Sequence, residues 1–179
     1  GVLIKHHDMT SLPTGVNGVP ENWKVSSVNI NNYLTIEALE DGLTVSLSAS
    51  ACEYCVDGDG NWKNLAAGTT TESINTGQTL SFRGNLTPTS SAGIGTFTIS
   101  KKCNVSGNVM SLMYGDEFED KIDLTNKKYA FYELFNGCTT IIDASKLILP
   151  ALTLASYCYD GMFYNCSGMT KAPKLPATT

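Results

Sequence analysis

The sequence predicts a mostly β protein with minor α structure, in which an antiparallel, β-sandwich-like domain precedes a short segment of stacked repeats. Three observations lead to this prediction. The 179-residue chain has 16 glycines and only 16% charged residues, a composition that favours strands and tight turns over long exposed helices. Its middle part alternates apolar and polar residues, and its last third contains an internal repeat.

Residues 1–27 are predicted to be an irregular lead-in, because glycine and proline interrupt this stretch repeatedly. The only two histidines, His6 and His7, lie in this lead-in beside Asp8. A catalytic histidine needs a fixed position next to a nucleophile, so we expect both to be surface residues.

The antiparallel β domain is predicted over residues 28–115. Apolar residues alternate over 34–38 and again over 43–49, and Asp41-Gly42 between the two runs predicts a hairpin turn with positive φ. Further strands are predicted at residues 54–56, 73–74, 79–83, 95–100 and 109–113, with Gly, Asn and Ser clusters between them. Several short strands with frequent turns are typical of an antiparallel sandwich or barrel.

Residues 116–179 are predicted to be the start of a leucine-rich-repeat solenoid with two units. The stretch YAFYELFNGCTTIIDASKL from Tyr129 aligns with YCYDGMFYNCSGMTKAPKL from Tyr157, and 157 minus 129 gives an offset of 28 residues. This period lies in the range of about 20 to 29 residues found in leucine-rich repeats. Leu154, Cys158 and Met162 stand four apart, which predicts a short helix with an apolar stripe.

Two units fall short of the roughly three that repeat arrays usually need for stability. We therefore expect either that the native chain continues past Thr179 or that it has been cut there.

The pieces CYDGMFYNCSGMTKAPKLPATT and LILPALTLASYCY resemble the repeat of BspA-like leucine-rich-repeat surface proteins of Bacteroides-type gut bacteria. The upstream stretches GNVMSLMYGDEF and YLTIEALEDG resemble the β-rich leader of such proteins. The resemblance covers about residues 33–179, although Ile141-Ile142-Asp143 in the first unit departs from the pattern. It implies an exported adhesion or ligand-recognition protein, located extracellularly or on the outer cell surface and without catalytic activity.

Two aromatic residues are the candidate binding residues. Tyr54 and Trp62 flank the stretch Asp57 to Asn61, and an exposed tryptophan at a hairpin tip can stack on a sugar ring. The main alternative function is therefore a glycan-binding accessory module that supports polysaccharide capture. The partner is predicted to be a host protein or a glycan.

The stretch around Cys52 and Cys55 has features of a metal or redox site, but simpler interpretations are favoured. The stretch CEYCVDGDGNW has three calcium-loop positions, but Trp62 and Gly68 replace the required glycine and glutamate, so a hairpin turn is favoured. Cys52 and Cys55 lack a second ligand pair, and no cofactor is expected. A disulfide from Cys103 to Cys52 or Cys55 stays an open alternative.

The acidic stretch YGDEFEDKID, residues 114–123, could bind calcium or supply acid and base carboxylates for a hydrolase. Its closely spaced like charges favour a solvated connector. Calcium near Asp57 or Asp116 remains an alternative.

The net charge of −5 opposes binding to nucleic acid and to anionic membrane surfaces. No apolar run reaches the roughly 18 residues of a membrane span, so membrane contact is expected only through an anchor that has been removed. The oligomeric state does not follow from the sequence.

Overall fold

The computed structural model describes residues 32–89 and 92–176. The predicted lead-in and both histidines lie outside the described residues. Within them the protein is mostly β, as predicted, and helix is limited to α1 (Ser111–Tyr114) and the 3-10 turn η2 (Gly115–Glu117).

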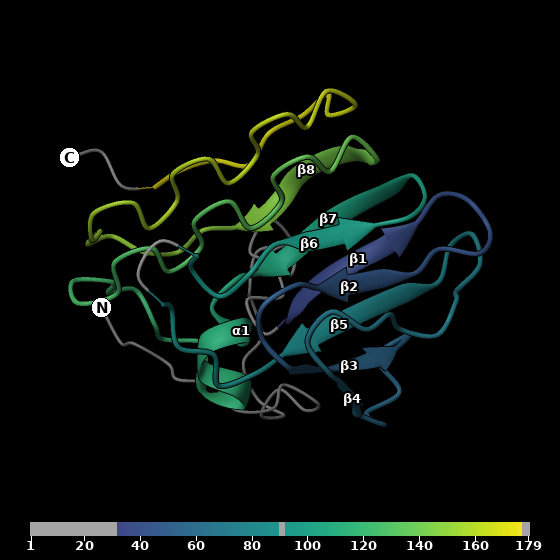
Figure 1. Cartoon of the computed structure of the whole chain (residues 1–179), viewed down its shortest axis with the longest axis horizontal. Helices are drawn as coiled ribbons and strands as arrows, with labels where there is room; N and C mark the ends of the chain where they lie inside the picture. Colours follow the sequence, from purple (N-terminus) through teal and green to yellow (C-terminus); the bar gives the residue numbers. More distant parts are fainter. Residues whose placement is uncertain (1–31, 90–91, 177–179) are drawn as a thin grey trace, which may run out of the picture.

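A six-stranded sheet with the order β4-β3-β5-β1-β7-β8 forms the body of the molecule (Figure 1). Its strands are β1 (Leu34–Ala38), β3 (Cys52–Val56), β4 (Lys63–Leu65), β5 (Thr79–Arg83), β7 (Cys103–Asn108) and β8 (Ile141–Ile148). All neighbours pair antiparallel except β7 and β8, which run parallel with two register shifts. The repeat segment thus joins the sheet of the preceding half through β8.

A second sheet of two antiparallel strands, β2 (Val45–Leu47) and β6 (Phe97–Ile99), lies in front of the large sheet in Figure 1. Alternate residues of the facing strands are buried, among them Ile36 from β1 and Leu47 from β2. The ring of Phe82 on β5 meets that of Phe97 on β6 at a centroid distance of 5.2 Å. The two layers therefore form a sandwich-like core, although the second layer is small.

The predicted hairpin over residues 34–49 is wrong. Gly42 does take a positive φ of 78°, but β1 pairs with β5 and β7 whereas β2 pairs with β6. The turn moves the chain from one layer to the other. Local alternation identified both strands correctly, and their partners come from distant parts of the sequence.

The strand predicted at 109–113 is also wrong, because this stretch enters α1. The Ser111 hydroxyl donates to the Phe82 carbonyl over 2.8 Å and accepts the Leu34 N–H over 3.0 Å. These buried bonds fix the helical turn at the ends of β1 and β5. The strand predicted at 73–74 is reduced to one bridge between Leu43 and Ile74, while that at 79–83 is confirmed as β5.

The two repeat units stack on each other at the predicted offset. Tyr129 lies on Tyr157 with centroids 4.8 Å apart and rings 6° from parallel. Phe135 lies between Phe97 and Phe163, with both centroid distances 5.5 Å. One hydrophobic core cluster runs from β1 to Cys166, so the first unit packs directly on the β layers. Two stacked units alone are not a solenoid.

The short helix predicted around residues 154–163 is wrong, and a series of tight turns replaces it. Cys158, Asp160 and Met162 each donate their N–H to the carbonyl three residues earlier. Every fourth residue takes a left-handed φ: Tyr157 at 62°, Gly161 at 61° and Asn165 at 58°. The apolar spacing of four comes from this turn period and not from an α-helix.

Candidate functional site

The outer face of the six-stranded sheet carries two rows of polar side chains. Since residues of a strand alternate between faces, burial of Leu34, Ile36 and Ala38 directs Thr35 and Glu37 outward. The register then defines the rows across neighbouring strands: Thr79, Glu37, Asn104, Asp143 and Lys171 in one, and Ser81, Thr35, Ser106 and Lys146 in the other. We call these two rows the polar face.

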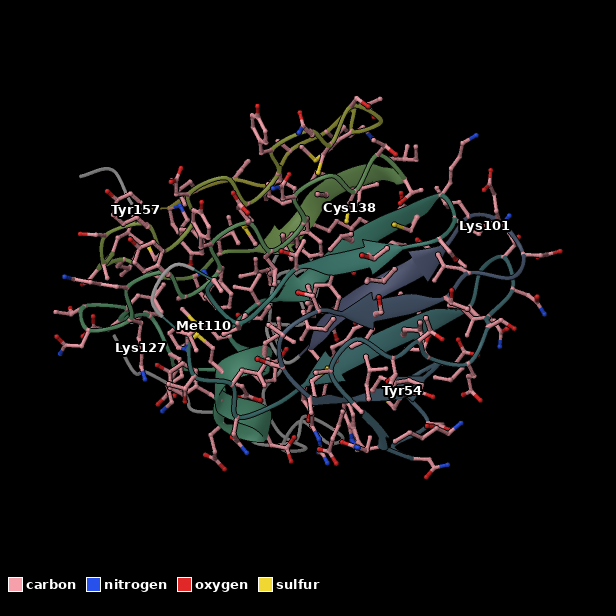
Figure 2. The ribbon with its side chains drawn as sticks, in the orientation of Figure 1. Tyr54, Lys101, Met110, Lys127, Cys138 and Tyr157 are labelled. Atoms are coloured by element: carbon pink, nitrogen blue, oxygen red, sulfur yellow. The ribbon has the colours of Figure 1, made fainter. Side chains whose placement is uncertain are left out.

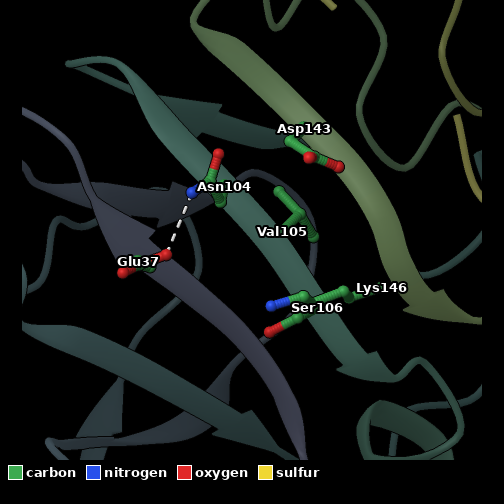
Figure 3. A pocket seen from close by; sticks show the side chains of 6 residues that line it. All are labelled: Glu37, Asn104, Val105, Ser106, Asp143 and Lys146. Atoms are coloured by element: carbon green, nitrogen blue, oxygen red, sulfur yellow. Dashed lines mark hydrogen bonds between the residues drawn. The ribbon is translucent and has the colours of Figure 1, made fainter. Parts of the chain in front are cut away.

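A shallow pocket of about 110 Å³ opens on the polar face between β1, β7 and β8 (Figure 3). It is lined by Glu37, Asn104, Val105, Ser106, Asp143 and Lys146. The Asn104 amide nitrogen donates to a Glu37 carboxylate oxygen over 3.0 Å, which fixes both side chains. The register shifts between β7 and β8 lie beside this pocket.

Asp143 is held ionised at the edge of the pocket. Hydrogen bonds from Ser145, including its backbone N–H at 2.8 Å, and the Lys171 ammonium at 3.1 Å lower the pKa of this carboxyl to about 2. The pocket therefore offers carboxylate acceptors from Glu37 and Asp143 beside the ammonium group of Lys146. Such groups can orient a polar ligand by hydrogen bonds and charge.

Tyr54, one of the two predicted binding residues, is buried. Its side chain is only 7% exposed, and its phenol oxygen accepts the Glu72 N–H over 3.4 Å. Figure 2 places it among the strands of the sheet. Tyr54 is therefore a core residue, which corrects its selection as a candidate binding residue beside an exposed Trp62.

Trp62 is half-buried in a cluster that the sequence did not reveal. The Arg83 guanidinium lies 4.2 Å from the centroid of its ring, and the Tyr33 ring meets it edge-on at 4.8 Å. Arg83 is itself held by Glu53 and by Asp116, each at 2.8 Å. One face of the indole is thus occupied by a cation, which leaves less of it for a sugar ring.

The stretch after β3 is a turn, as favoured from the sequence. Asp59 accepts the Asn61 N–H over 2.8 Å, and Asp57 accepts the Thr79 N–H over 2.8 Å together with the Gln78 amide. Asp59 therefore closes the turn itself, and Asp57 ties the turn to the start of β5. Among residues 32–89 and 92–176 no group of three or more metal-ligating side chains occurs.

All six cysteines are free and buried, so the structure contains none of the disulfides considered above. Burial raises the pKa of Cys52, Cys103 and Cys138 to about 12. Cys138 and Cys166 occupy equivalent places, since their thiols donate to the carbonyls of Phe97 and Phe135, each over 3.0 Å.

The acidic stretch is partly used in ion pairs. Asp116 accepts the Tyr33 hydroxyl over 2.9 Å besides pairing with Arg83, and Asp120 lies 3.1 Å from the Lys121 ammonium. Asp116 therefore ties this connector to the Trp62 cluster.

The polar face was missed because β7 and β8 were not identified as strands. Asn, Ser and Gly in CNVSGN have low strand propensity, although the polar positions 104 and 106 do alternate. That alternation was the available signal.

Comparisons of the chain with protein-family models, with curated proteins and with solved structures find no match. In the part of the chain that the structure describes, no helix has the length and apolar character needed to cross a membrane.

Proposed function

We propose that the chain is part of a non-catalytic, exported surface protein that recognises its ligand through the polar face of the six-stranded sheet. The observation that carries this proposal is the pocket between β1, β7 and β8, with its carboxylates, amide, hydroxyl and ammonium on rigid strands. A sheet supports such groups without large entropic loss on binding. The resemblance to BspA-like surface proteins supports a role in adhesion.

We further infer that residues 116–176 are the beginning of a leucine-rich-repeat array. The 28-residue offset and the ring-on-ring stacking of Tyr129, Phe131 and Phe135 with their equivalents support this interpretation. In such an array the polar face would extend strand by strand, since Asp143 already bridges to Lys171 of the second unit.

The test uses a glycan array and a panel of immobilised host surface proteins, probed with the purified chain. Adhesion predicts saturable binding to a host protein that weakens at least about tenfold in Asn104→Ala and Lys146→Ala, the range expected when a central contact is truncated. Lys101→Ala, at an exposed turn outside the pocket, is the control.

Glycan binding lost on Trp62→Ala would instead support the accessory module that captures polysaccharide. If Asn104→Ala, Lys146→Ala and Trp62→Ala all leave binding unchanged, both proposals are contradicted.

A further inference from the structure

A second pocket, of about 320 Å³, lies between the loop that follows β5 and the first repeat unit. Thr87 and Pro88 line it on the loop side, and residues 125–129 line it on the repeat side. We call it the basic pocket. Its volume is at the lower end of the range in which proteins bind small molecules, about 300 to 1,000 Å³. Its repeat side belongs to the first unit, on which the second unit is already stacked.

The two sides of the basic pocket are held against each other by a close contact. A Cβ at Gly93 would lie 2.6 Å from the Tyr129 carbonyl oxygen, so a residue with a side chain could not come as near to the repeat unit. Thr89 and Gly93 exchange two backbone hydrogen bonds of 3.0 and 3.2 Å, which tie the loop to this contact. The shape of the pocket is therefore part of the fold and does not have to form when a ligand binds.

The first repeat unit supplies a fixed wall. Alternate N–H groups of this unit, beginning with Tyr129, donate to carbonyls of the second unit, and the bond from Tyr129 to Ser156 measures 3.2 Å. The Tyr129 ring is stacked on that of Tyr157, with centroids 4.8 Å apart, and meets the edge of the Tyr132 ring at 5.5 Å. Tyr129 thus lines the pocket as a half-buried side chain whose position is set by its neighbours.

The charge of the basic pocket is positive. Among the described residues that line it, the only charged ones are Lys127 and Lys128, and neither makes an ion pair with any described residue. Four other lysines do pair with carboxylates: Lys63, Lys102, Lys121 and Lys171. Asp123 does not line the pocket, and its carboxylate accepts the N–H and the hydroxyl of Thr125. In a chain of net charge −5, two adjacent unpaired ammonium groups form a local site for an anion.

The remaining lining residues favour a sugar over an inorganic ion. Thr87 and Asn126 offer a hydroxyl and an amide that can hydrogen-bond to sugar hydroxyls. Pro88 and Tyr129 offer ring surfaces on which the C–H face of a pyranose can pack. The pocket on the polar face is smaller, about 110 Å³, and its two carboxylates repel an anion.

We propose that the basic pocket binds one acidic sugar unit, a pyranose that carries a carboxylate or a sulfate group. Lys127 and Lys128 hold the anionic group through charge-assisted hydrogen bonds, and Pro88 and Tyr129 pack on the ring. This site is separate from the polar face and from Trp62. The inference therefore goes beyond the proposed function, and neither depends on the other.

Two acidic disaccharides serve as probes in NMR titrations of the complete chain, one ending in glucuronic acid and one in a sulfated galactose. Their neutral counterparts are the methyl ester of the first and the desulfated form of the second. The expected result is saturable shifts of the backbone amides of Thr87 and of residues 125–129. The dissociation constant should be at least about tenfold lower for an acidic probe than for its neutral counterpart, because the charge-assisted bonds are lost in the latter. The acidic probe that binds identifies the anionic group.

Two adjacent pairs of lysines provide matched variants. Replacing both Lys127 and Lys128 by glutamine should raise the dissociation constant at least about tenfold. Replacing both Lys101 and Lys102 by glutamine removes the same charge and should leave binding unchanged, since Figure 2 places Lys101 and Lys127 at opposite ends of the molecule. Thermal unfolding of both double variants confirms that they are folded.

Four results would overturn the proposal. The first is the lack of saturable shifts with either acidic probe, and the second is an equal dissociation constant in the parent chain and the Lys127 and Lys128 double variant. The third is a set of shifts confined to residues 104–106 and 143–146, which would place the sugar on the polar face. The fourth is binding of inorganic sulfate as tight as that of the acidic disaccharides, which would show that the sugar ring contributes nothing.

Discussion

At the scale of single residues, the sheet contains a glycine that is required because a side chain would not fit there, and not only because its φ is positive. Gly107 in β7 has a φ of 79°, and a Cβ at this position would collide with the Tyr33 carbonyl oxygen. Gly60, in the turn after β3, has nearly the same φ of 75°, but a Cβ there meets nothing within 4 Å. Substitution of Gly60 therefore tests backbone strain alone, whereas substitution of Gly107 tests strain together with a steric clash.

Gly107→Ala should therefore destabilise the protein by about 3 kcal/mol or more, because both strain and displacement of β1 contribute. Gly60→Ala should cost about 1 kcal/mol through strain alone. Urea denaturation followed by circular dichroism measures both changes. Equal losses in the two variants would show that the close contact between β7 and Tyr33 is absent.

The Asp143 carboxylate makes stability depend on pH. Because its pKa in the folded protein is lowered to about 2 from an ordinary value of 3.8, the contribution is complete above about pH 4 and is lost as the pH falls towards 2. Asp143→Asn should flatten the fall of the melting temperature in this window. Asp160→Asn, which removes the same charge from an exposed site, is the control. If the melting temperature of Asp143→Asn falls with pH as it does in the parent chain, Asp143 does not cause the pH dependence.

At the scale of elements, the repeat units show how spacing can be misinterpreted. Apolar residues at intervals of four are compatible with a helix of 3.6 residues per turn, but over several intervals they drift around its axis. In the structure Cys158, Met162 and Cys166 keep an unbroken spacing of four and all are buried, as the turn period requires. The repeat offset was visible in the sequence, whereas the turn geometry depends on hydrogen bonds between units.

The stacked rings of Phe97, Phe135 and Phe163 predict the order of the stability losses caused by mutation. Phe135→Ala should destabilise by about 3 to 5 kcal/mol, because its ring is fully buried between Phe97 and Phe163. Phe163→Ala should cost less than half as much, since this ring is stacked on one side and half-buried. Chemical denaturation tests the order, and a larger loss for Phe163→Ala would contradict the stacking.

At the scale of the whole molecule, the sequence predicts the mostly β class and a strand such as 79–83, because alternation is local information. It does not predict which strands pair. The Asp41-Gly42 turn connects two layers because β1 pairs with β5 and β7, which lie far along the chain. The polar face could not be predicted for the same reason, because its rows form only when β1, β7 and β8 pair with one another. Trp62 was identified from its residue type, but Arg83 above its ring was not foreseeable.

The central claim is that the two repeat units are stacked through alternate amides on the β layers. Hydrogen exchange of the chain alone, resolved by residue, tests it most directly. We predict slow exchange for Tyr129, Phe131 and Phe135, and fast exchange for their equivalents Tyr157, Tyr159 and Phe163, while Cys158 and Met162 exchange at intermediate rates. Fast exchange of all three first-unit amides, or uniformly slow exchange throughout residues 155–166, would contradict the account.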